Sequence, residues 1–182
     1  MKCAFVGHSY IYSKTLRARL VRAIKKEINN GCTSFIMGTH GDFDSMALSI
    51  CRRLRSNYKE IDIEVVITSL ATKKKSEEER YPNPYTDVKT VMYDIEDAHY
   101  KQQITLSNRK MIDECDTLIC YVDEEEYRSG AKTAMRYAQK RGLKVVNLYG
   151  EQDNPLYDMT EEEKDRLYLI LWNEIKGNNI KK

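Results

Sequence analysis

Short apolar runs alternate with segments of helical periodicity along most of this chain. The first run, Cys3 to Val6, ends at Gly7, and the following segment places Leu16 and Leu20 at the four-residue spacing of an amphipathic helix. A second apolar run, at residues 33–37, is again closed by a glycine and followed by a helical pattern. Strands that alternate with helices predict a parallel sheet, because each helix serves as the crossover between two strands.

The same patterns predict the remaining elements. We expect strands at residues 3–6, 33–37, 61–67, 117–122 and 143–149, and helices at residues 13–28, 42–54, 102–114 and 129–140. This order predicts an α/β fold, a three-layer, doubly wound parallel sheet of about five strands. Thr160-Glu161-Glu162-Glu163 is a capping-box signature that opens a further helix at residues 160–176. We expect that C-terminal helix to pack against the sheet.

Residues 70–93 interrupt the alternation with a basic block, an acidic block and Tyr81-Pro82-Asn83-Pro84-Tyr85. A loop of this length inside a compact domain is commonly functional, so we predict a surface loop or lid. The length of 182 residues fits one domain over residues 1–182.

Composition narrows the classes of function. The formal net charge is only +2, which disfavours nucleic acid and membrane surfaces as partners. No apolar run approaches the roughly 20 residues that span a bilayer, and the chain starts without a signal-peptide pattern, so we expect a cytoplasmic protein. The odd set of cysteines without a C-x-x-C pair predicts reduced, buried thiols with neither disulfide nor zinc: Cys3, Cys32, Cys51, Cys115 and Cys120.

Candidate binding residues follow the predicted strands. In open parallel sheets, ligands lie beyond the carboxyl ends of the strands, where the strand order reverses. Glycine turns at such positions present backbone N–H groups and a positive helix end to an anion. The turns here supply Gly7 and His8, then Gly38, Thr39, His40, Gly41, Asp42 and Asp44, and finally Ser129 and Gly130.

The charged residues of these turns allow more than one role. Asp42 is expected to cap the following helix, and Asp44 to accept hydrogen bonds from sugar hydroxyls. His8 and His40 are candidate donors or acid–base groups, and no histidine has the neighbouring ligands that a metal centre requires. Arg109 is the remaining basic candidate, on the helix before the fourth predicted strand; taken alone, it is an ordinary surface arginine.

Four motifs together resemble the SLOG superfamily, a Rossmann-like group that includes the lonely-guy phosphoribohydrolases and the DNA-processing protein A domain. They are Val6-Gly7-His8, the stretch M-G-T-H-G-D-F-D-S-M-A-L from Met37 to Leu48, S-N-R-K-M from Ser107 to Met111, and D-T-L-I-C-Y-V with S-G-A. The resemblance covers residues 2–149 and is closest to small bacterial and phage proteins of unknown function. It implies a Rossmann-like fold and a homodimer.

The resemblance also implies a nucleotide-derived ligand at the strand ends. Gly38, Thr39 and Gly41 would lie near phosphate, Arg109 would act as a charged clamp, and Ser129 with Gly130 would form a second phosphate or ribose contact. The lonely-guy motif P-G-G-x-G-T-x-x-E and the related deoxyribosyltransferases carry a catalytic glutamate, and this chain has Ser129-Gly130-Ala131-Lys132-Thr133-Ala134 without it.

Two functions of different classes therefore stay open. The first is binding or sensing of a nucleotide-derived small molecule, without a cofactor. The second is hydrolysis or transfer at an N-glycosidic bond, in which Asp42, Asp44 or Asp123 supplies the missing carboxylate and His8 or His40 assists. Glu124 is a further carboxylate that could take this place. Analogy with DNA-processing protein A also suggests nucleic-acid binding, which the near-neutral net charge disfavours.

Overall fold

A computed structural model describes residues 1–67, 84–95, 98–127 and 129–150, together with the positions 153, 160, 162, 165, 166, 168–170 and 172. The chain divides into two compact units, Met1–Tyr149 and Gly150–Lys182. In the second unit, the described positions between residues 162 and 172 are helical, in the segment where a C-terminal helix is expected. Residues 70–83 of the predicted loop lie outside the described residues.

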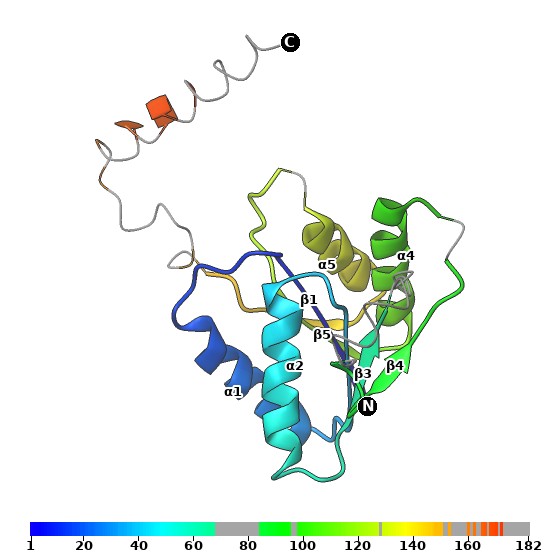
Figure 1. Ribbon diagram of the computed structural model, residues 1–182. Helices are drawn as coiled ribbons and strands as arrows, with labels where there is room; N and C mark the ends of the chain where they lie inside the picture. The colour runs from blue at the N-terminus through cyan, green and yellow to red at the C-terminus, as the bar shows by residue number, and fades with distance from the viewer. Residues whose placement is uncertain are drawn as a thin grey trace, which may run out of the picture. The chain divides into compact units, whose positions relative to one another are not determined.

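The first unit is built on a six-stranded, all-parallel sheet with the strand order β4-β3-β2-β1-β5-β6 (Figure 1). Its strands are β1 (Lys2–Gly7), β2 (Ser34–Met37), β3 (Asp62–Val66), β4 (Lys89–Val91), β5 (Thr117–Tyr121) and β6 (Lys144–Asn147). Its helices are α1 (Leu16–Asn29), α2 (Asp42–Arg55), α4 (Tyr100–Asp113) and α5 (Gly130–Lys140). The predicted doubly wound α/β fold is confirmed.

The sheet has six strands, one more than the number of about five that we expected. The additional strand, β4, lies in the segment that we expected to be a loop, and it pairs with β3 at the edge of the sheet. Its three residues, Lys89, Thr90 and Val91, are exposed or partly exposed. A strand this short and this exposed carries no apolar run, so its pattern does not distinguish it from a loop.

Each face of the sheet has its own hydrophobic core. Successive residues of a strand point to opposite faces, so Cys3 and Phe5 pack with residues of α1 and α2, whereas Ala4 and Val6 pack with residues of α4 and α5. Figure 1 shows these two pairs of helices on opposite sides of the sheet. Because both faces are covered, the central strands read as continuous apolar runs, and β5 is buried along its whole length.

Aromatic packing connects the first core to the carboxyl edge of the sheet. Phe5 lies 6.5 Å from Phe43 of α2 between ring centroids, and Phe43 stacks on Tyr121 at 6.1 Å. Tyr121 in turn lies 5.2 Å from Tyr149 and 6.1 Å from His8, which follow β6 and β1. The side chains at the ends of the strands are therefore held against the rigid core.

Candidate functional site

The strand order reverses between β1 and β5, which are hydrogen-bonded neighbours. The chain leaves β1 toward α1 on one face of the sheet and leaves β5 toward α5 on the other face. The loops after these strands, residues 8–15 and 122–129, are the position at which open parallel sheets bind ligands.

His8 connects these two loops. Its Nε2 accepts a hydrogen bond from the backbone N–H of Asp123 at 2.6 Å, and its Nδ1 lies 3.0 Å from Glu126 Oε2 and 3.5 Å from Ser129 Oγ. A ring nitrogen that accepts a hydrogen bond carries no proton, so we assign the proton of neutral His8 to Nδ1. Ser129 and Glu126 then compete for one nitrogen, which is not the arrangement of a nucleophile–base–acid triad.

The carboxylate of Asp123 is already bound within the protein. Its Oδ2 accepts from the Tyr149 hydroxyl at 3.0 Å, and its Oδ1 accepts from the backbone N–H of Glu125 at 2.9 Å. These bonds hold the first turn of the loop after β5. They give this candidate acid a positioning role in the structure.

The turn between β2 and α2 contains Gly38, Thr39 and His40, and it packs against the loop after β1. Asp42 is not the cap of α2 that we expected; the N-cap is Gly41, and Asp42 Oδ2 accepts from the backbone N–H of Ile11 at 3.3 Å. Asp42 is the first residue of the helix and not the residue before it. The Asp42 carboxylate therefore binds the neighbouring loop.

Asp44 lies beneath the same turn. Its Oδ2 accepts from the backbone N–H of His40 at 3.1 Å, and burial raises the pKa of Asp44 to about 6. Burial also lowers the pKa of His40 from its usual value. The carboxylate holds the turn from within, and a Cβ at Gly38 would lie 2.9 Å from it.

The glycines of the site serve different purposes. A Cβ at Gly7 would lie 2.4 Å from the ring of Phe43, and one at Gly41 would lie 2.7 Å from Ser9 Cα. Both glycines therefore allow close packing of protein on protein. A Cβ at Gly130 meets nothing within 4 Å, so space is open at the first residue of α5.

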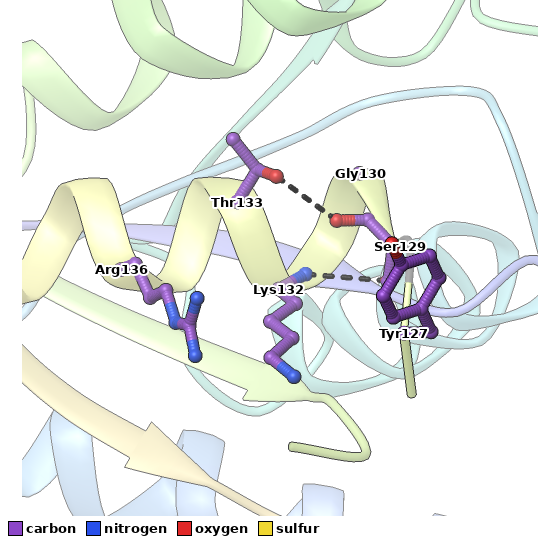
Figure 2. Close-up of a pocket in the computed structure, with 6 residues that line it drawn as sticks. All are labelled: Tyr127, Ser129, Gly130, Lys132, Thr133 and Arg136. Carbon is purple, nitrogen blue, oxygen red and sulfur yellow. Dashed lines mark hydrogen bonds between the residues drawn. The ribbon is translucent and has the colours of Figure 1, made fainter. Parts of the chain in front are cut away.

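A pocket of about 380 Å³ occupies that space. It is lined by Tyr127, Ser129, Gly130, Lys132, Thr133 and Arg136 (Figure 2). Ser129 is the N-cap of α5, and its Oγ accepts from the backbone N–H of Lys132 at 3.3 Å. Figure 2 shows Lys132 and Arg136 extending from the same side of the helix, with the ring of Tyr127 beside Ser129 at its N-terminal end. The Lys132 ammonium also donates to the carbonyls of Glu124 and Glu126.

Arg109 lies on α4, next to this pocket. It lines a small crevice with Gly130 and Thr133, and its guanidinium carbon lies 5.5 Å from the centre of the Tyr137 ring. The structure thus brings Arg109 beside Gly130. The turn of Gly38, Thr39 and His40 instead contacts the loop after β1, where the Ser9 hydroxyl donates to the carbonyl of His40 at 3.3 Å.

Several residues of the site carry no motif signal. Glu126, Tyr127, Tyr149 and Arg136 are absent from the predicted set. Tyr149 and Tyr127 follow strands at the same edge as the glycine turns, and inspection of every strand end would have found them. Arg136 is found only from its position one helical turn after Lys132.

None of the five cysteines lines this pocket. Cys3, Cys32, Cys51 and Cys120 are buried and Cys115 is partly buried, in line with the expected burial of the thiols. Burial raises the pKa of the Cys51 and Cys120 thiols to about 12, which keeps both protonated at neutral pH.

Within the described part of the chain, no three His, Cys, Asp or Glu side chains are grouped as a metal site requires. No helix among the described residues is long and apolar enough to cross a membrane.

Comparison with protein families gives one match that covers most of the chain. The model of the YspA SLOG family matches residues 8–150, which includes all of the first unit from the histidine after β1 onward. A search of curated proteins finds no match. The matched segment contains the glycine turns, Arg109 and the first turn of α5, and the chain therefore belongs to the YspA SLOG family of Rossmann-like proteins.

Proposed function

We propose that this protein binds a nucleotide-derived small molecule at the carboxyl edge of its sheet, with a phosphate at the first turn of α5. The observation that carries the proposal is the pocket of about 380 Å³ at that turn, which contains two cationic side chains. Among the described residues, no carboxylate lines it.

Backbone geometry supports an anion at this position. The first N–H groups of a helix have no acceptor inside the helix. Those of Lys132 and Thr133 donate to Ser129, whereas those of Gly130 and Ala131 have no acceptor among the described residues. These N–H groups and the positive end of the helix favour a phosphate at the first turn, and the Arg136 guanidinium adds positive charge further along the same pocket.

The turn before α2 is less suited to phosphate. Its N–H groups at His40 and Asp42 already donate to Asp44 and to the backbone of Ser9. Asp42 and Asp44 also place negative charge in the first turn of α2. We therefore propose that the phosphate binds at α5 and that the turn before α2 forms a wall of the site.

The test is a thermal-shift screen of the full chain against nucleoside mono- and diphosphates, followed by titration of each compound that stabilises it. The decisive variant is Gly130→Glu, because its Cβ meets nothing within 4 Å and an acidic residue at a helix N-terminus stabilises the helix. The free variant should unfold at or above the wild-type temperature, and its affinity should fall at least about 100-fold through repulsion of the phosphate.

The matched control is Gln139→Glu, which adds the same charge to an exposed position of α5 outside the pocket. It should bind as the wild type does. Wild-type affinity in Gly130→Glu, or no stabilisation of the wild type by any compound, would contradict the proposal.

A second function is favoured by the position of Glu126. Its carboxylate is about half exposed, lies 3.0 Å from His8 Nδ1, and precedes Tyr127 of the pocket. In an N-glycosidic hydrolysis, the Glu126 carboxylate would take a proton from water while the water oxygen bonds to the anomeric carbon. The bond between that carbon and the nucleobase nitrogen breaks, and the nucleobase leaves with the proton that Glu126 took up. Chromatography of each stabilising compound tests this function: base released by the wild type and not by Glu126→Gln supports it, and an unchanged compound excludes it for that compound.

A further inference from the structure

The most exposed large hydrophobic side chains of the described residues lie on two loops at the carboxyl edge. Tyr10 and Tyr12 are 75% and 73% exposed on the loop after β1, and Tyr127 is 86% exposed on the loop after β5. The two loops are joined through His8 and Glu126. Single exposed apolar residues are normal on a protein surface, so exposure by itself does not mark any one of the three rings as a binding residue.

Of these three tyrosines, Tyr127 lines the α5 pocket. It lies two residues before the N-cap, and Figure 2 shows its ring at the N-terminal end of the helix. Lys132 and Arg136 follow along the helix, one turn apart, on a shared side. The pocket therefore has an aromatic surface at one end and positive charge along its length.

We propose that Tyr127 is the specificity-determining residue of the site, because a nucleobase stacks on its ring while phosphates bind along α5. This inference rests on the proposed function and names its ligand class, a nucleoside diphosphate. Two cationic side chains one helical turn apart suit more than one phosphate, and an exposed ring gains from stacking because both planar surfaces leave water.

The inference separates nucleotides from ligands without a base. Inorganic pyrophosphate offers the same anionic groups as the diphosphate of ADP, but it has nothing to place on Tyr127. The full chain should therefore bind ADP more tightly than pyrophosphate, and only ADP binding should depend on the tyrosine ring.

The experiment is calorimetric titration of ADP and of pyrophosphate into the wild type, Tyr127→Ala, Tyr127→Phe and Tyr12→Ala. Tyr127→Ala should weaken ADP binding about 5- to 150-fold, the range that loss of one base–aromatic stack gives, and leave pyrophosphate binding unchanged. Tyr127→Phe keeps the ring and should retain ADP binding. Tyr12→Ala removes another highly exposed tyrosine, which lies outside the pocket, and should change the binding of neither ligand.

Each other outcome overturns the inference. Equal wild-type affinities for ADP and pyrophosphate would show that the base is not recognised and would leave phosphate binding at α5 intact. Equal losses of both ligands in Tyr127→Ala would show that the tyrosine acts on the loop and not on the base. Absence of binding by both ligands to the wild type would overturn the proposed function together with the inference.

Discussion

Among the glycines of the site, replacement of Gly7 by alanine should destabilise the first unit most. The new Cβ would lie 2.4 Å from Phe43 Cγ and 2.6 Å from Phe43 Cβ, about 1 Å short of ordinary contact. Rotation of the ring cannot relieve the contact with Phe43 Cβ, which is fixed to the backbone of α2, so the helix itself must move away from β1. Phe43 is fully buried and stacks on Tyr121, so this movement disrupts a filled core.

Overpacking of a core costs about 1–3 kcal/mol, and a contact to a backbone-anchored atom belongs in the upper half of that range. For a chain of this length, 1 kcal/mol changes the melting temperature by about 2–4 °C, so Gly7→Ala should melt about 4–12 °C below the wild type. The assay is thermal unfolding followed by circular dichroism. Gly130→Ala is the matched control, and it should be neutral or more stable because its Cβ meets nothing within 4 Å. Melting of Gly7→Ala within about 1 °C of the wild type would refute the packing argument.

Two further predictions concern carboxylates. Burial raises the pKa of Asp44 to about 6, so its contribution to stability is full below its unfolded pKa of 3.8 and is lost as the pH rises through 6. The unfolding free energy of Asp44→Asn should therefore rise by about 2–3 kcal/mol relative to that of the wild type between pH 4 and pH 7, as measured by denaturant unfolding. A difference between the two proteins that does not change with pH would count against this assignment. Asp87 forms ion pairs with Arg52 and Arg55, which lower the pKa of its exposed carboxyl. Asp87→Asn should cost about 1 kcal/mol or less at low salt, and equal unfolding free energies of the two proteins are expected at 1 M salt, where screening removes the pairs.

The regular elements of the first unit were predictable because their signals are local. The spacing of Leu16, Leu20 and Ile24 requires a helix with one buried face, and α1 buries these three residues. The edge strand at Lys89 was missed because three exposed residues have no apolar periodicity. Its existence depends on pairing with β3, which the sequence of the segment does not encode by itself.

The location of the candidate site was predictable for a topological reason. Parallel strands end at one edge, so the turns that follow β1, β2 and β5 must lie at the same side of the sheet. The roles of individual residues were not predictable. Asp42 and Asp44 have similar positions in the sequence, yet one binds the loop after β1 and the other holds its own turn from within.

The amino-acid sequence by itself determined the α/β class, the order of most elements and the edge of the sheet at which the candidate site lies, because periodicity and glycine positions act over a few residues. Only the tertiary structure decided which groups are available for chemistry. His8 and Asp123 are separated by 115 residues, and their hydrogen bond exists because β1 and β5 are neighbours in the sheet. Contacts of this kind depend on the packing of distant segments, and the same packing leaves the first turn of α5 open.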